Sequence, residues 1–146
     1  MSNEPSESVE FNDLMFLALD HGFASIEDCS GPLIPFVIAK TAAGEREMHR
    51  FVCEKLEESS QKAKEYIEAE KSNLQIYALA WDGYITLDGK KWDAILVEAG
   101  ERGNEFGLLM CQRYEKKGFI KKKNHKVGNP VLIEKPKSII FVKTMA

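Results

Sequence analysis

The stretch from Leu74 to Ala99 decides how this chain folds: LQIYALAWDGYITL (74–87), DG (88–89) and KKWDAILVEA (90–99). Two runs rich in aromatic and β-branched residues flank the dipeptide Asp88-Gly89, and this composition is typical of β-strands. Asp-Gly favours a type I′ turn, in which both central residues take a positive φ. The sequence therefore predicts a β-hairpin that turns at Asp88-Gly89.

A two-residue turn also fixes which residues face one another across the hairpin. Leu87 faces Lys90 in this register, and the count continues along both strands. The further pairs are Ile85 with Trp92, Tyr84 with Asp93, Trp81 with Leu96, and Leu79 with Glu98. A bulge at residues 81–83 would shift the pairs beyond it by one residue.

Both faces of the predicted hairpin carry apolar side chains. Those of one face are Trp81, Ile85, Trp92 and Leu96, and those of the other are Ala80, Ile95 and Val97. A sheet that is apolar on both faces must be covered on both. We expect helices on one side, and sheet curling, a second layer or a partner subunit on the other.

Before the hairpin, residues 9–20 (VEFNDLMFLALD) predict a helix with Ser8 as N-cap and Gly22 as C′ residue. Its expected apolar surface consists of Phe11, Leu14, Met15 and Ala18, extended by Phe16 and Leu19. Apolar residues around so much of a helix predict burial on more than one side. We expect residues 1–8 to be a disordered lead and residues 9–146 to form one domain.

The segment between that helix and the hairpin leaves two interpretations open. Residues 33–39 (LIPFVIA) predict a strand, and Pro35 makes it an edge strand or places the proline early in it. Residues 45–52 fit either the start of a helix that runs to Lys71 or a second strand that closes a hairpin on residues 33–39. From Glu54 onward the apolar spacing is helical. The solvated face of that helix would carry Glu57, Glu58, Lys62, Glu65 and Glu68.

After the hairpin we expect a loop over residues 100–105 and a third, antiparallel strand over residues 106–114. Residues 128–130 (GNP) predict a turn, and short strands follow it over residues 131–134 and 138–143. Strands that follow helices in this order predict an α+β fold. Two main helices would pack on a predominantly antiparallel, curled sheet centred on the Asp88-Gly89 hairpin.

Composition narrows the class of protein. The chain has 146 residues, the length of about one domain. Cys29, Cys53 and Cys111 are too few and too far apart for a disulfide framework, so we expect free thiols. The acidic N-terminus lacks the features of a signal peptide, and no apolar run approaches the roughly 20 residues of a membrane span. We therefore expect a cytoplasmic protein without a membrane partner.

Charge is distributed unevenly along the chain. The net charge is −3, but residues 1–70 hold 15 acids and 6 bases, whereas residues 71–146 hold 8 acids and 14 bases. Such asymmetry is compatible with two different partners, one for each half. We favour the simpler interpretation, in which the two halves attract each other.

No motif for catalysis or cofactor binding is present. The stretch from Gly83 to Lys91 has the wrong spacing and residue types for a phosphate-binding loop, and neither G-x-G-x-x-G nor G-x-S-x-G occurs. His21 and His125 stand alone, and His49 with Cys53 supplies only two ligands of a metal site. We predict no catalytic residue, no metal and no cofactor.

Polar residues interrupt the apolar strands of the hairpin. The candidate ligand-binding residues are Trp81, Tyr84, Trp92, Glu98 and Arg113. Without slippage of the third strand, Glu98 would face Gly107 and Arg113 would face Trp92. An unpaired carboxylate on an apolar face has a raised pKa, as general acids do. We favour a structural ion pair of Glu98 with Arg113 or Arg102.

Two neighbouring acids of the hairpin are Asp82 and Asp93. Asp93 and Glu98 stand five positions apart on one strand, so they point to opposite faces. They therefore cannot both bind one metal ion unless a bulge intervenes.

A lysine-rich segment covers residues 116–126 (KKGFIKKKNHK). Its basic residues are Lys116, Lys117, Lys121, Lys122, Lys123 and Lys126. Lysines can bind phosphate backbones, but the segment has no arginine and a single aromatic residue, and the pI is about 5.7. A lysine-rich loop or edge strand that prevents edge-to-edge pairing is the simpler interpretation.

Three functional hypotheses follow, in order of preference. The first is a non-enzymatic protein that binds an unknown protein partner or its own copy as a homo-oligomer. The second is a small-ligand binder or enzyme with a pocket at the candidate residues on the hairpin sheet. The third is phosphate-backbone binding through residues 116–126. It ranks last, so nucleic acid is not the partner that we expect.

Overall fold

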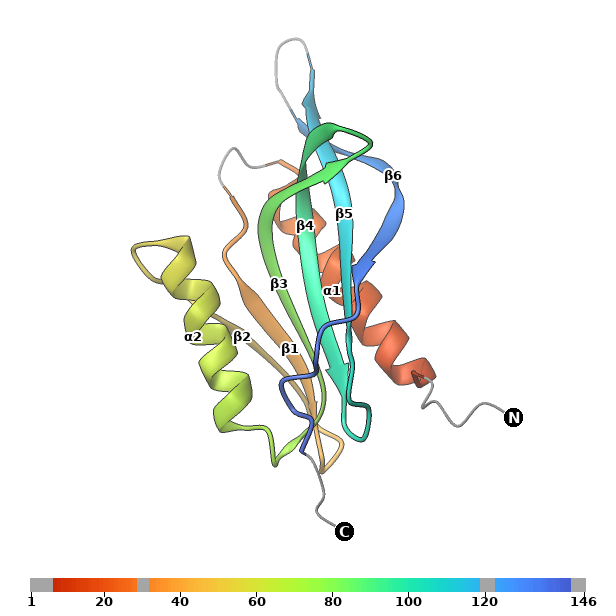
Figure 1. Cartoon of the computed structure of the whole chain (residues 1–146). Helices are drawn as coiled ribbons and strands as arrows, with labels where there is room; N and C mark the ends of the chain where they lie inside the picture. Colours follow the sequence, from red (N-terminus) through yellow and green to blue (C-terminus); the bar gives the residue numbers. More distant parts are fainter. Residues whose placement is uncertain (1–6, 29–31, 119–122, 143–146) are drawn as a thin grey trace, which may run out of the picture.

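The computed structural model describes residues 7–28, 32–118 and 123–142. Its elements are α1 (Val9–Ile26), β1 (Phe36–Thr41), β2 (Arg46–Arg50), α2 (Leu56–Ala69), β3 (Leu74–Leu87), β4 (Lys90–Glu101), β5 (Leu108–Lys117) and β6 (Lys123–Glu134). The strands form one open antiparallel sheet in the order β2-β1-β3-β4-β5-β6. Figure 1 shows a helix on either side of this sheet. The predicted α+β class is confirmed.

The two helices pack on opposite faces because alternate residues of a strand point to opposite sides. On the α1 face, Ile76 and Ala78 of β3 and Ile95 of β4 join the buried side of the helix. On the α2 face, Tyr77 and Leu79 of β3 join Ala63 and Ile67 of α2. The inner half of the hairpin is therefore covered on both faces, by two separate clusters.

The predicted hairpin is confirmed in position and register. The pairing runs from Leu87 with Lys90 to Ile76 with Glu101 without a shift, so there is no bulge at residues 81–83. Asp88 has a φ of 52° and Gly89 a φ of 77°, the positive values that the turn requires.

Helix α1 is longer than predicted, and Gly22 does not end it. Ser8 caps the helix, its side chain accepting a hydrogen bond from the backbone N–H of Phe11. Gly22 lies inside the helix and packs on β4, where an added Cβ would stand 2.9 Å from Cγ2 of Ile95. Phe16 is 43% exposed, so the prediction of burial on more than one side is wrong: one side faces the sheet and the other faces solvent.

The hairpin alternative is correct for residues 45–52. Arg46–Arg50 forms the edge strand β2, and its residues pair with β1. Strand β1 lies between β2 and β3, so it is not an edge strand, and Pro35 lies just before it rather than early within it. The helix predicted from Glu54 onward begins at Leu56, and the five charged residues assigned to its outer face are exposed.

Three predictions for the C-terminal part are wrong. The β4–β5 register lies two residues from the expected one, because β4 continues to Glu101 and Phe106 pairs with Lys137 instead. Residues 128–130 are not a turn but an irregularity inside β6, where the register against β5 shifts. Residues 138–142 form no strand, and Lys143 lies outside the described residues.

The described residues include no helix that is both long enough and apolar enough to cross a membrane. Cys53 and Cys111 are free thiols, and Cys29 lies outside the described part of the chain. Ser8, within the expected lead, is fixed by its N–H, which donates a 3.0 Å hydrogen bond to Glu101.

Candidate functional site

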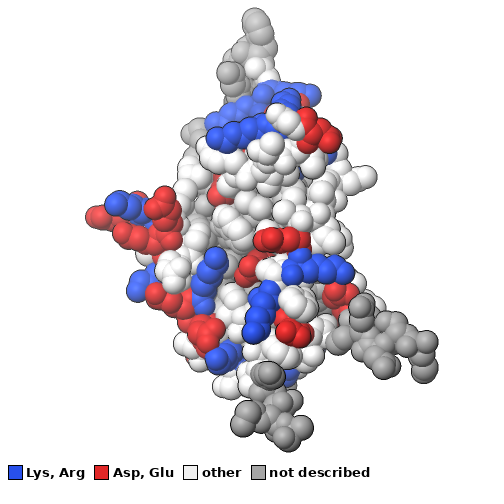
Figure 2. All heavy atoms as spheres, in the orientation of Figure 1, with Lys and Arg blue, Asp and Glu red and all other residues white. Residues whose placement is uncertain are grey.

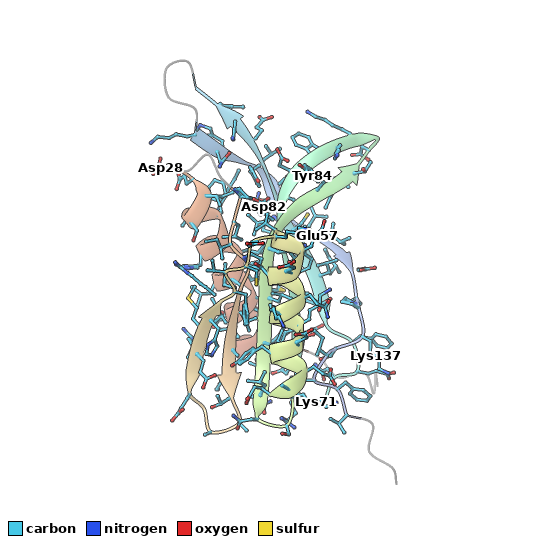
Figure 3. All side chains as sticks on the ribbon, turned by 90° about the vertical axis from the view of Figure 1, so that its left-hand side faces the viewer. Asp28, Glu57, Lys71, Asp82, Tyr84 and Lys137 are labelled. Carbon is cyan, nitrogen blue, oxygen red and sulfur yellow. The ribbon has the colours of Figure 1, made fainter. Side chains whose placement is uncertain are left out.

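The outer half of the β3–β4 hairpin carries most of the candidate residues. Strand β1 pairs with β3 no further than Ala80, whereas β4 accompanies β3 to Leu87. The outer half of the hairpin thus extends past β1 and has one strand fewer beside it. Figure 3 shows it bending away from the sheet, with Asp82 and Tyr84 on β3.

The five predicted residues are divided between the two faces of the sheet. Trp81, Trp92, Glu98 and Arg113 lie on the α2 face, since they share the alternation of Leu79 and Leu96. Tyr84 lies on the α1 face, where its side chain is 65% exposed. The structure therefore brings four of the five to one face and separates Tyr84 from them.

The α2 face has an apolar area that no helix covers, which we call the tryptophan face. Helix α2 covers β1 and β3, but the outer parts of β4 and β5 lie beyond it (Figure 1). Half-exposed side chains pack against the buried Ala94, Leu96 and Cys111 there, namely those of Trp81, Ile85, Leu109 and Val131. Trp92, also half-exposed, pairs with Ile85 on the same face.

Neighbouring residues fix the position of the Arg113 side chain on this face. Its Cζ atom lies 5.1 Å from the ring centre of Trp92. Gly128, with a φ of 66°, makes room for the guanidinium, because a Cβ there would stand 2.6 Å from Nη2. The side chain of Gln112 fixes the irregular backbone by donating to the carbonyls of Val127 and Gly128 at 3.3 and 3.2 Å.

Glu98 and Arg113 do not face each other. Arg113 pairs with Ala94, four residues from Glu98 along β4, so the two residues are about 13 Å apart along the strands. Burial raises the pKa of Glu98, and the charge of Lys64 on α2 partly offsets that rise. Arg102 instead donates to the carbonyls of Leu74 and Lys71, at 3.0 and 2.8 Å.

On the opposite face, three strands align Tyr84, Asp93 and Tyr114 in one row. Tyr84 pairs with Asp93, and Asp93 pairs with Tyr114 on β5. The exposed Asp93 carboxylate thus stands between two tyrosines, with adjacent Cβ atoms about 5 Å apart. We did not predict Tyr114, although strand alternation already assigned it to the face of Asp93.

Asp82 lies two residues before Tyr84 on β3, on the same face of the sheet, and hydrogen bonds hold its carboxylate in place. Its Oδ1 accepts a 2.7 Å hydrogen bond from the Tyr114 hydroxyl, and its Oδ2 accepts a 3.0 Å bond from the N–H of Leu33. Burial raises the pKa of Asp82, although both hydrogen bonds oppose the rise. Burial and the bond to Asp82 raise the pKa of Tyr114 above its ordinary value.

These side chains line a pocket of about 410 Å³. Its walls come from the β3–β4 and β5–β6 hairpins, from the start of α2 and from the chain before β1. The lining residues are Pro32, Leu56, Asp82, Gly83, Tyr84, Asp93, Tyr114, Lys116 and Asn124.

The lysine-rich segment forms the end of the β5–β6 hairpin. Lys116 and Lys117 end β5, Lys123 and Lys126 begin β6, and all four are exposed. Lys121 and Lys122 lie outside the described residues. Ion pairs join Lys117 with Glu115, Lys123 with Asp28, and Lys126 with Asp20, at 3.0 to 3.4 Å.

In the part of the chain that the structure describes, no group of His, Cys, Asp or Glu residues could hold a metal ion. His49 lies on β2, where it contacts Glu47 and the Tyr66 ring. Comparison with family models, curated proteins and solved structures gives no match. Functional assignment therefore rests on the geometry of the two faces.

Proposed function

We propose that this protein is a non-enzymatic module that associates with a second copy of itself through the tryptophan face. The observation that carries the proposal is the uncovered half of the sheet, where Trp81 and Trp92 lie among half-exposed aliphatic side chains. Aromatic residues in such a patch are frequent anchors of protein interfaces. Association would supply the missing layer over β4 and β5.

Charge around the face favours a second copy as the occupant. Figure 2 shows a largely uncharged area with an acidic group at one side, by the start of α2, and a basic band above it, by the hairpin tips. Glu54, Glu57 and Glu58 are exposed in the first region, and Lys90, which shares the face of Trp92, is exposed in the second. A two-fold axis in the plane of the face, running between the two groups, exchanges them. Each acidic group then meets the basic group of the other copy.

Sedimentation velocity over a range of protein concentrations tests this proposal. We expect a concentration-dependent dimer, and Trp92→Ala should weaken it by about 2 kcal/mol, or roughly thirtyfold in Kd. Phe16→Ala is the matched control, because Phe16 is an exposed aromatic residue on α1 that faces away from the sheet. A monomer at every concentration, or equal effects of both variants, would contradict the proposal.

Charge reversal separates a second copy from a different partner. Glu57→Lys in one protein and Lys90→Glu in another should each weaken self-association. Mixing the two variants should restore a heterodimer, since opposite charges meet again across the axis. Dimers that both variants leave unchanged would show that the charged groups do not meet.

A second candidate function is binding to a phosphate backbone at the hairpin tips. The ammonium of Lys90 lies 3.9 Å from the Trp92 ring centre, and that of Lys91 lies 4.2 Å from the Tyr84 ring centre. Lysines beside aromatic rings match the requirements of a single-stranded nucleic acid. Fluorescence anisotropy with a labelled oligonucleotide should show binding that Lys90→Gln weakens and Lys135→Gln does not. Binding that does not weaken as salt increases would contradict this mechanism.

A further inference from the structure

The pocket on the α1 side of the hairpin is independent of the tryptophan face. Its polar side chains, Asp82, Tyr84, Asp93 and Tyr114, belong to strand positions that point away from Trp81 and Trp92. A ligand there would not need the dimer, and the dimer would not need the ligand.

The row of Tyr84, Asp93 and Tyr114 has the chemistry of a site for a positively charged ligand. The faces of aromatic rings attract cations, and a carboxylate between two rings adds an opposite charge at the centre. The Tyr84 ring already attracts a cation in this structure, since the Lys91 ammonium lies 4.2 Å from its centre. Tyr114 is rigidly placed, because its ring is buried and its hydroxyl is bonded to Asp82.

A second carboxylate strengthens the preference for a cation. Asp82 is partly desolvated, and the negative charge of Asp93 adds to the rise of its pKa. A ligand cation near both carboxylates would relieve their repulsion. Lys116 is the basic residue among those that line the pocket.

The apolar part of the wall indicates an organic cation rather than a metal ion. Leu56, which is 41% exposed, and Pro32 line the pocket together with the polar side chains. Methylene or methyl groups can pack there, whereas a small inorganic cation requires several oxygen ligands. A volume of about 410 Å³ lies within the range of small-molecule sites.

We propose that the pocket between the two hairpins binds an organic ammonium ion, with Asp93 as the charge partner and the Tyr84 and Tyr114 rings as the aromatic walls. Asp82 is a positioning residue that holds Tyr114. The apolar group of the ligand packs on Leu56.

Titration with butylammonium chloride, followed by amide NMR shifts, tests the proposal. We expect saturable shifts at Gly83, Asp93 and Tyr114. Butanol is the neutral counterpart, and sodium chloride at the same concentration controls for ionic strength. Neither should produce these saturable shifts. Because the readout is local, it is independent of whether the protein dimerises.

Variants then identify the residues that bind the ligand. Asp93→Asn should lower the affinity about tenfold or more, and Tyr84→Leu about fivefold. Both side chains are exposed, so the fold should not depend on them. Asp88→Asn is the matched control: it removes an exposed carboxylate of the same hairpin, at a positive φ that Asn accepts. Absence of saturable shifts, equal shifts with butanol, or an affinity that Asp93→Asn leaves unchanged would overturn the proposal.

Discussion

The hydroxyl of Tyr114 on β5 donates a 2.7 Å hydrogen bond to Oδ1 of Asp82 on β3, passing over the intervening strand β4. The other oxygen of the same carboxylate accepts the N–H of Leu33, so Asp82 joins β3, β5 and the chain that leads into β1. Asp82 and Tyr114 both line the pocket, so this hydrogen bond holds two of its wall residues together.

Tyr114→Phe should lower the free energy of unfolding by about 1.5–3 kcal/mol, the range for hydrogen bonds to charged groups. The variant keeps the ring and removes the donor, leaving a partly buried carboxylate with one partner fewer. Urea denaturation measures the change. Tyr84→Phe, at an exposed hydroxyl, should change stability by less than about 0.5 kcal/mol. Equal changes in the two variants would show that the bond to Asp82 contributes nothing.

The β3–β4 hairpin could be predicted from sequence because its information is local. Asp88-Gly89 specifies a turn of two residues, and that turn alone sets every pair from Leu87 to Ile76. The β4–β5 register could not be derived in the same way. The connection is longer, and Phe106 is drawn to Lys137, a contact over 31 positions of sequence that no local pattern encodes.

The candidate site was predictable to the same extent. Strand alternation placed Trp81 and Trp92 on one face, and the structure agrees. The grouping of Tyr84 with them depended on sequence proximity rather than on alternation, which puts it on the other side. The partner of Tyr84 across β4 is Tyr114, and only the true β4–β5 register aligns the two tyrosines with Asp93.

Glu98→Gln should stabilise the protein near neutral pH and have a smaller effect in acid. Burial raises the pKa of Glu98 above its ordinary 4.5, so the folded chain holds the proton to a higher pH than the unfolded chain. Stability therefore falls as the pH rises from about 4.5 through the folded pKa, and is level above it. Gln carries no charge at either pH, so the variant does not lose stability in this way as the pH rises. Denaturation of both proteins at pH 4 and pH 7 measures it, and an equal difference at the two pH values would contradict the expectation.

Gly128→Ala should destabilise the protein more than Gly44→Ala. Both glycines have a positive φ, of 66° and 89°, and a side chain at such a φ costs about 1–2 kcal/mol. A Cβ at Gly44 meets nothing within 4 Å, whereas one at Gly128 stands 2.6 Å from Nη2 of Arg113. The difference between the variants isolates the displacement of Arg113 from Trp92. Denaturation measures the free energies of unfolding, and tryptophan fluorescence reports the displacement of Arg113 from Trp92. Identical results for the two variants would exclude a role of Gly128 in placing Arg113.

Tyr77→Phe should loosen the C-terminal segment without disturbing the sheet. The Tyr77 side chain is fully buried beneath α2, and its hydroxyl oxygen accepts a 3.1 Å hydrogen bond from the N–H of Ile139. Loss of this acceptor should cost about 1 kcal/mol, because a neutral bond is removed and the ring still fills its place. Burial raises the pKa of Tyr77 to about 12, so the hydroxyl keeps its proton and the effect should not vary with pH below that value.

Amide hydrogen exchange is the measurement that resolves this effect by position. In Tyr77→Phe the N–H of Ile139 should exchange faster than in the wild-type protein, while the amides of β3 and β4 keep their protection. Tyr66→Phe serves as the control, because it removes a hydroxyl that donates to Glu47 of β2, away from the C-terminal segment. If Ile139 exchanged at the wild-type rate in Tyr77→Phe, packing of Ile140 against α2 would be the interaction that holds the segment in place.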